Sequence, residues 1–231
     1  MPVGVPKLPY LIPIEDDDDD EDDDEEELSW VDLYNRLYRD RALFLFSNLT
    51  LETANHVVGL MIFLNIDDST QEQFLFINST GGGVMHGLAV HNAIQFVEPD
   101  VHTLCLGVAA SMAAFILAGG SPTKRVAFPN SRVMIHQPAS SFIDGYMEEV
   151  IFEGDAVLKL RDQMVNFYVE RSQKPFWIVN EDMERDVFMT PEEAKDYGIV
   201  DFIGTAGIEA RKLLDPEELE EIEELGEFDE D

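Results

Sequence analysis

Short continuous runs of apolar residues alternate along this 231-residue chain with longer stretches in which apolar residues recur every three or four positions. Continuous runs indicate strands buried on both faces of a sheet, and the recurring spacing indicates amphipathic helices. Repeated strand–turn–helix units predict an α/β fold in which helices pack against a sheet. Strands are predicted at residues 42–46, 74–77, 101–106, 125–128, 132–136 and 199–203. Helices are predicted around residues 31–37, 51–62 and 84–97, directly after residue 111, and at 146–171 and 190–197.

The net charge of −33 lies mostly in two appendages of this predicted domain. Residues 15–27 are thirteen consecutive acidic residues, residues 215–231 hold eleven more, and neither segment contains Lys or Arg. Without these 24 charges the chain carries −9, which is ordinary for a soluble domain. Runs of like charge repel themselves, so both segments are expected to be disordered. Nucleic acid is an unfavourable partner because no basic stripe is present to neutralise its phosphates.

The sequence also argues against a disulfide-stabilised or membrane-spanning protein. Cys105 is the single cysteine, which excludes an internal disulfide and a cysteine-ligated zinc site. Residues 101–123 are uncharged, but Gly107, Ser111 and Pro122 interrupt them, which is typical of strand–turn–helix–turn and not of a membrane span. The first thirteen residues lack the features of a signal or transit peptide, so we expect no export from the compartment of synthesis.

Two glycine-rich turns each follow a predicted strand and precede a predicted helix: residues 78–83 (NSTGGG) and 107–111 (GVAAS). Side by side, they could point backbone N–H groups at one place, as an oxyanion hole requires, with Ser111 as a nucleophile at the helix start. A phosphate cradle is the competing use, but residues 78–83 match neither a P-loop nor the dinucleotide fingerprint. Ser111 could equally cap a helix in a tightly packed core.

His136 is the most favourable of the five histidines as a general base. It ends a predicted strand, which is where sites assemble in open α/β folds. A carboxylate would have to hold its imidazole in the required tautomer. Asp186 is one candidate among several in residues 181–186, where local spacing does not select it and a charged surface turn is the alternative. The other histidines lie in predicted helices or at a strand start without zinc-binding spacing: His56, His86, His91 and His102.

Taken together, these segments resemble one family, the proteolytic subunit of the Clp protease (ClpP). Residues 107–112 (GVAASM) are similar to its nucleophile motif, and residues 132–138 (RVMIHQP) to its histidine motif. Residues 184–186 (ERD) are similar to its aspartate segment, and residues 76–82 (FINSTGG) to its glycine loop. The likeness covers about residues 29–203 and implies a ClpP/crotonase-like α/β fold of repeated β-β-α units with a protruding helical handle.

The resemblance implies a role for each candidate residue. Ser111 is the expected nucleophile, His136 the general base and Asp186 its orienting partner. Backbone N–H groups of Gly82 and Met112 are the expected oxyanion hole. The chain is then a serine endopeptidase that cleaves unfolded proteins to short peptides, without a metal or cofactor of its own and without nucleic acid or membrane.

The opening residues, together with residues 29–41 and 180–189, look most like the plastid-encoded branch of the family, which implies the chloroplast stroma. The implied assembly is two stacked heptameric rings shared with related subunits, with the helix at residues 146–171 between rings. An AAA+ Clp unfoldase at the ring face would use ATP.

The expected divisions of the chain are a flexible axial segment with the acidic insertion at residues 1–28, a peptidase domain at 29–205 and an acidic tail at 206–231. We hypothesise that the acid run 15–27 rings the pore and disfavours acidic substrates.

Two departures from the family pattern leave other interpretations open. Thr80 stands where the family usually has Pro, and Gly83 replaces a bulkier residue, so the glycine loop could be looser and turnover lower. A catalytically silent structural ring subunit is therefore one alternative. The other is an acyl-CoA enzyme of the crotonase type, which shares the fold and a two-amide oxyanion hole but would not need Ser111, His136 and Asp186 together.

Overall fold

A seven-stranded sheet forms the centre of the computed structural model, which describes residues 4–13, 26–139 and 146–204. The strands run in the order β3-β4-β5-β6-β9, while β7 pairs with β5 and carries β8. Every pairing in this sheet is parallel except that of β7 with β8. The strands are β3 (Ala42–Leu45), β4 (Gln73–Ser79), β5 (Val101–Ala110), β6 (Arg125–Ala127), β7 (Arg132–Ile135), β8 (Val187–Met189) and β9 (Phe202–Ile203).

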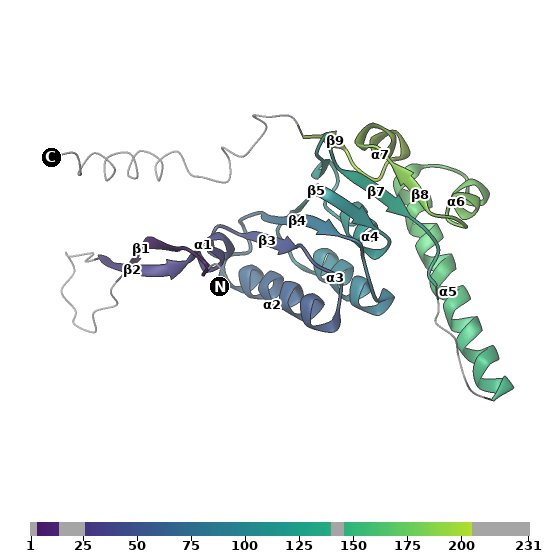
Figure 1. Cartoon of the computed structure of the whole chain (residues 1–231), viewed down its shortest axis with the longest axis horizontal. Helices are drawn as coiled ribbons and strands as arrows, with labels where there is room; N and C mark the ends of the chain where they lie inside the picture. Colours follow the sequence, from purple (N-terminus) through teal and green to yellow (C-terminus); the bar gives the residue numbers. More distant parts are fainter. Residues whose placement is uncertain (1–3, 14–25, 140–145, 205–231) are drawn as a thin grey trace.

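Helices alternate with these strands along the chain, which confirms the predicted α/β class, and α2, α3 and α4 lie together on one side of the sheet (Figure 1). Thr50 begins α2 and Thr190 begins α7 as predicted, because each side chain accepts a hydrogen bond from the backbone N–H three residues later. The helices are α1 (Leu33–Arg39), α2 (Leu51–Asp67), α3 (Val84–Phe96), α4 (Met112–Ala118), α5 (Met147–Ser172), α6 (Phe176–Asp182) and α7 (Pro191–Tyr197).

Strand β5 is long enough to pair with two neighbours in succession. Residues 103–105 pair with β6, and residues 108–110 pair with β7. The register between β4 and β5 shifts after Ile77, where Oδ1 of Asn78 accepts a hydrogen bond from the backbone N–H of Val108 at 3.1 Å. The carboxyl ends of β4, β5 and β7 therefore meet at one edge, which is where open parallel sheets assemble their sites.

Only one face of β3 and β4 is deeply buried, so the prediction that these strands are buried on both faces was wrong. Leu43 and Leu75 are fully buried in the core shared with the helices. Phe44 and Phe76 point to the opposite face, remain half-buried and stack with ring centroids 5.6 Å apart. The cause is that this face is covered only in part, by aromatic side chains such as Tyr34 of α1, whose ring packs edge-on against Phe44.

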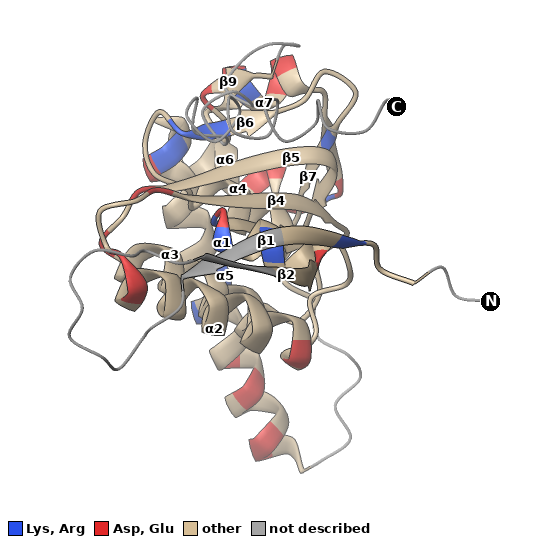
Figure 2. Ribbon diagram, turned by 90° about the vertical axis from the view of Figure 1, so that its left-hand side faces the viewer, with Lys and Arg blue, Asp and Glu red and all other residues tan. Residues whose placement is uncertain are grey.

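Helix α5 extends away from the sheet as the predicted handle, while the β1–β2 hairpin projects from another part of the domain (Figure 1). Only the end of α5 near the sheet is buried, through Met164, Val165 and Tyr168. Towards its start the helix exposes apolar side chains, including Phe152 at 76%. Acidic residues also gather towards this free end (Figure 2). The handle therefore presents an apolar and acidic surface that this chain alone leaves uncovered.

Several elements differ from the sequence prediction. The helix expected around residues 31–37 begins only at Leu33, because β2 (Glu26–Asp32) pairs antiparallel with β1 (Lys7–Pro13). Helix α6 and strand β8 have no counterpart among the predicted elements, and the last strand is confined to β9. Residues 14–25 and 205–231 lie outside the described residues, so disorder of the acid run and tail stays a prediction. No helix within the described ranges is long and apolar enough to cross a membrane.

Arg125 and Asp201 form an ion pair between β6 and the turn that leads to β9. Arg125 Nε lies 2.9 Å from Asp201 Oδ2, and the second guanidinium nitrogen, Nη2, lies 2.6 Å from Oδ1. Burial alone would raise the pKa of the Asp201 carboxyl, but hydrogen bonds and charge from Arg125 outweigh it and hold that pKa below its ordinary value. A carboxyl with a lowered folded-state pKa stabilises the fold above its unfolded pKa of about 3.9. That contribution is lost as the pH falls through the folded value.

Asp201→Asn is therefore expected to lower the free energy of unfolding by about 2 kcal/mol at pH 7, because the buried guanidinium loses its anionic partner. The difference from the parent protein should shrink as the pH falls below about 4. Urea denaturation at neutral and acidic pH measures both effects. Asp196→Asn removes the same charge from an exposed position on α7 and serves as the control. An equal loss in the control, or a difference that grows on acidification, contradicts this account.

Candidate active site

Ser111 occupies the sharp turn between β5 and α4. Its backbone has φ 57° and ψ −125°, a strained conformation for a residue other than glycine and typical of a nucleophile held at a strand-to-helix turn. The backbone N–H of Ser111 donates to the carbonyl oxygen of Met134 at 2.9 Å, which ties this turn to β7. The Ser111 side chain makes no capping hydrogen bond to α4, so the alternative role as a helix cap was wrong.

Sheet register brings His136 to Ser111. Strands β5 and β7 pair Ala110 with Met134, so the residues that follow these two strands emerge side by side. His136 Nε2 lies 2.9 Å from Ser111 Oγ. At this distance the serine hydroxyl can donate its proton to the imidazole, which is what a general base requires.

Asp186 reaches His136 through the antiparallel pairing of β7 with β8. Ile135 is paired with Val187, so His136 and Asp186 are the next residues opposite each other. Asp186 Oδ1 lies 2.8 Å from His136 Nδ1. With Nδ1–H donating to Asp186, Nε2 remains the acceptor for the Ser111 proton. Asp182 in the same segment instead accepts a hydrogen bond from the Tyr197 hydroxyl at 3.0 Å.

The glycine loop, residues 79–83, lies directly against the Ser111 turn. A Cβ on Gly81 would come within 2.9 Å of Ser111 Cβ and 3.0 Å of the backbone N of Met112, and Gly81 has φ 86°. Close approach and a left-handed backbone both require glycine here. Within the described chain, the backbone N–H groups of Gly82 and Met112 donate to no other group. Among the described residues, the glycine loop and the start of α4 therefore each offer one backbone N–H beside Ser111 that has no hydrogen-bond acceptor.

Hydrogen bonds attach the glycine loop to the segment before α2. Ser79 Oγ donates to the carbonyl oxygen of Ser47 at 2.6 Å, and Leu49 N–H donates to the carbonyl oxygen of Gly81 at 2.9 Å. Thr80 Oγ1 adds a hydrogen bond to Asn48 Oδ1 at 2.8 Å that a proline could not make. Of the two positions where the sequence suggested a looser loop, Thr80 and Gly83, Thr80 is therefore held by a side-chain hydrogen bond.

Arg161 supports the segment that carries His136, and the sequence did not predict this role. It lies on α5, and its Nε donates to Gln137 Oε1 at 2.8 Å. Gln137 directly follows His136, and its backbone N–H donates to the carbonyl oxygen of Met183 at 2.7 Å. Arg161 therefore links the handle to the strand end that carries His136. The only signal in the sequence is that Arg161 shares a helix face with the apolar residues Met164, Val165 and Tyr168, and this pattern does not identify its hydrogen-bond partner.

Two other histidines, His91 and His102, and the cysteine Cys105 take no part in the hydrogen-bonded chain of Ser111, His136 and Asp186. Burial, with the nearby charge of Arg171, lowers the pKa of His91 to about 4. His102 is hydrogen-bonded to Glu72 at 2.7 Å. Burial raises the pKa of the Cys105 thiol to about 11, which makes it a poor nucleophile. Among the residues that the structure describes, no group of three or more His, Cys, Asp or Glu is placed to hold a metal ion.

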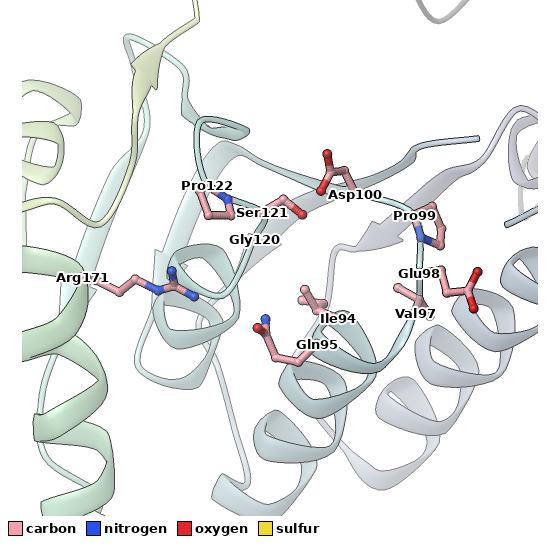
Figure 3. Close-up of a pocket in the computed structure, with 10 residues that line it drawn as sticks. All are labelled: Ile94, Gln95, Val97, Glu98, Pro99, Asp100, Gly120, Ser121, Pro122 and Arg171. Atoms are coloured by element: carbon pink, nitrogen blue, oxygen red, sulfur yellow. The ribbon is translucent and has the colours of Figure 1, made fainter. Parts of the chain in front are cut away.

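A pocket of about 250 Å³ lies at the edge of the sheet where β5 begins (Figure 3). Arg171 from the end of α5 and Gln95 from α3 point into it, and Asp100 lies on the opposite side (Figure 3). Asp100 is already paired with Lys124 at 2.8 Å, and Gln95 donates to the carbonyl oxygen of Gly119. The pocket contains no residue of the Ser111 site and is therefore separate from it.

Comparison with known proteins identifies the family to which this chain is similar. A family model described as Clp protease matches residues 24–207. A relative from Staurastrum punctulatum, named ATP-dependent Clp protease proteolytic subunit, is 53% identical over 205 residues, covering 89% of this chain and 97% of the relative. Proteins of the same name from Coffea arabica and Adiantum capillus-veneris are 54% and 50% identical, covering 88% and 90% of this chain and 98% and 99% of their own length. The matched range contains every residue of the candidate site.

Proposed function

The chain belongs to the Clp protease family, whose members are serine peptidases, and on this premise we propose that Ser111, His136 and Asp186 are its catalytic triad. The observation that carries the proposal is the continuous hydrogen-bonded chain from Asp186 Oδ1 through His136 to Ser111 Oγ, with steps of 2.8 and 2.9 Å. Three residues far apart in the sequence reach this arrangement only because β5, β7 and β8 are neighbours.

The geometry supports acyl transfer from a peptide to water. Ser111 Oγ attacks the scissile carbonyl carbon while its proton passes to His136 Nε2, and His136 then gives that proton to the leaving amine. Asp186 holds the imidazole in the required tautomer and stabilises its charged form. The N–H groups of Gly82 and Met112 are proposed to bind the developing oxyanion. Water then releases the acyl group by the same steps in reverse, and no metal or cofactor is required.

Two alternative functions are less well supported. A silent ring subunit has no need of a complete triad or of the strained backbone at Ser111. A crotonase-type acyl-CoA enzyme would use the two amides without the connected His136 and Asp186. Casein and short-peptide cleavage by complexes that carry Ser111→Ala in this chain distinguishes a catalytic subunit from a silent one.

The proposed assembly is two stacked heptameric rings that this chain shares with related proteolytic subunits. The exposed apolar side chains of α5, among them Ile151 at 58%, support a contact between rings at the handle. The named relatives are ATP-dependent, so an AAA+ Clp unfoldase is the proposed partner that hydrolyses ATP and feeds in unfolded proteins. The relatives are plant and algal proteins, which supports a plastid origin, and we propose the chloroplast stroma as the location of the complex.

The acid run is proposed to repel acidic substrates at the axial entrance. Residues 15–25 lie between the paired strands β1 and β2, and only the backbone of the last two acidic residues, within β2, is described. Deleting residues 16–24 removes nine of these acidic residues and leaves Ile14, Glu15 and Glu25 as a three-residue connection between the two strands. Because exposed charges interact over about 10 Å at 0.1 M salt, the deletion should accelerate degradation of an acidic unfolded protein at low salt and have little effect at 1 M salt. A basic unfolded protein is the control, and equal rates for the acidic substrate before and after deletion would sink the hypothesis.

A further inference from the structure

His86 fills the space that a side chain on Gly83 would take. A Cβ on Gly83 would lie 2.6 Å from His86 Nδ1 and 3.1 Å from its Cε1. Gly83 has φ −58° and ψ 130°, a conformation open to any residue. A side chain on Gly83 would therefore have to displace the His86 imidazole, although the backbone conformation would admit any residue.

The helix start explains how His86 reaches this space. Gly83 is the N-cap of α3 and makes no side-chain capping bond, and His86 is the third residue of the helix. A side chain at the third position of a helix folds back over the N-cap, as the acidic residue of a capping box does. The imidazole of His86 thus lies over Gly83 from inside the helix.

Leu49 joins His86 to the glycine loop. The carbonyl oxygen of Leu49 accepts a hydrogen bond from the Gly83 N–H at 3.2 Å and lies 3.4 Å from His86 Nδ1. The latter contact is long for a hydrogen bond, so His86 acts here mainly by packing. The backbone of Leu49 also lies so close to Gly82 that a Cβ on Gly82 would overlap it. His86, Leu49, Gly82 and Gly83 therefore form one packed unit.

We infer that His86 is a positioning residue for the oxyanion hole. By filling the space beside Gly83, it fixes the backbone of the glycine loop and so holds the Gly82 N–H in place. The inference rests on the proposed role of Gly82 as an oxyanion donor. A bulkier residue at position 83 would fill this space from the loop itself, whereas this chain fills it from the first turn of α3. The His86 side chain then compensates for the missing side chain at Gly83, so this glycine does not make the loop loose.

A cycle of three variants tests the pair: His86→Ala, Gly83→Val, and the two together. The readout is phosphonylation of Ser111 by a fluorophosphonate in the assembled complex, followed by the mass of this chain so that other subunits do not contribute. Ser111 Oγ attacks phosphorus, fluoride leaves, the proton passes to His136, and the phosphoryl oxygen occupies the oxyanion hole. Both the maximal labelling rate and the half-saturating probe concentration are measured.

Each single variant should lower the maximal labelling rate about tenfold and leave the half-saturating concentration within about twofold. The reason is that a displaced donor loses part of the 10²- to 10³-fold effect of a complete oxyanion donor. The double variant should return to within about threefold of the parent, because valine refills the space. Such non-additivity is the sign of a direct contact. His56→Ala, which removes an exposed imidazole on α2, should change nothing.

The inference is overturned if His86→Ala leaves the maximal labelling rate unchanged. It is also overturned if the fold-loss of the double variant equals the product of the two single fold-losses. The proposed function survives either result, because the parent chain would still be labelled at Ser111. If the parent chain is not labelled at all, the proposed function itself fails. Native mass of each complex, unchanged across the set, shows that the variants assemble.

Discussion

Ser111→Ala is expected to lower peptide hydrolysis by this chain at least about 10⁴-fold. The Ser111 hydroxyl is the hydrogen-bond partner of His136 Nε2, so its removal leaves no nucleophile for the acyl-enzyme step. Turnover of a short fluorogenic peptide by the assembled complex measures the loss, because such a peptide needs no unfolding. Where partner subunits are also active, the measured loss is this chain's share of the total.

Ser69→Ala is the matched control, since it removes a hydroxyl from the segment between α2 and β4, far along the chain from the site. It should retain full activity, and both variants should give complexes of the parent mass. If Ser111→Ala retained the parent rate, this chain would be a silent ring subunit. If both variants were equally slow, the loss would report general damage and not nucleophile removal.

Asp186→Asn should have the second-largest effect, a loss of about 10⁴-fold in kcat. The asparagine amide can donate to His136 Nδ1, which places the imidazole proton on Nε2 and removes the acceptor for the Ser111 hydroxyl. Because substrate contacts are unchanged, KM should move little. The measurement is the kcat and KM of the same short peptide.

Asp182→Asn provides the comparison within the same acidic segment. Asp182 bonds Tyr197 and not His136, so its variant should keep kcat within about threefold of the parent. Equal losses in the two variants would mean that the segment's general charge matters and that Asp186 has no special role.

Much of the fold followed from apolar patterning, and its failures have physical causes. Strands β3 to β7 and helices α2 to α5 stand close to their predicted positions because each is a continuous apolar run or a regular amphipathic stretch. Strand β8 has three residues, too few to show a period. The outer face of β3 and β4 was mistaken for a buried one, since the aromatic side chains there pack on one another.

The site was only partly accessible from the sequence for a related reason. Ser111 and His136 each stand at the end of a strong strand signal, so local pattern singled them out. Asp186 ends the segment 181–186, which shows no periodic signal, and it meets His136 through a strand pairing across 50 residues. Only the family resemblance selected it from its acidic neighbours. The support of Gly83 by His86 was invisible because it depends on which side chain fills a space.

Covalent labelling of the native complex with a fluorophosphonate, followed by mass mapping of this chain, shows whether Ser111 is an active nucleophile. We expect one phosphonyl group on Ser111, none in Ser111→Ala, and a greatly slowed reaction in Asp186→Asn. A complex in which partner subunits are labelled while Ser111 of this chain stays unmodified would contradict this expectation.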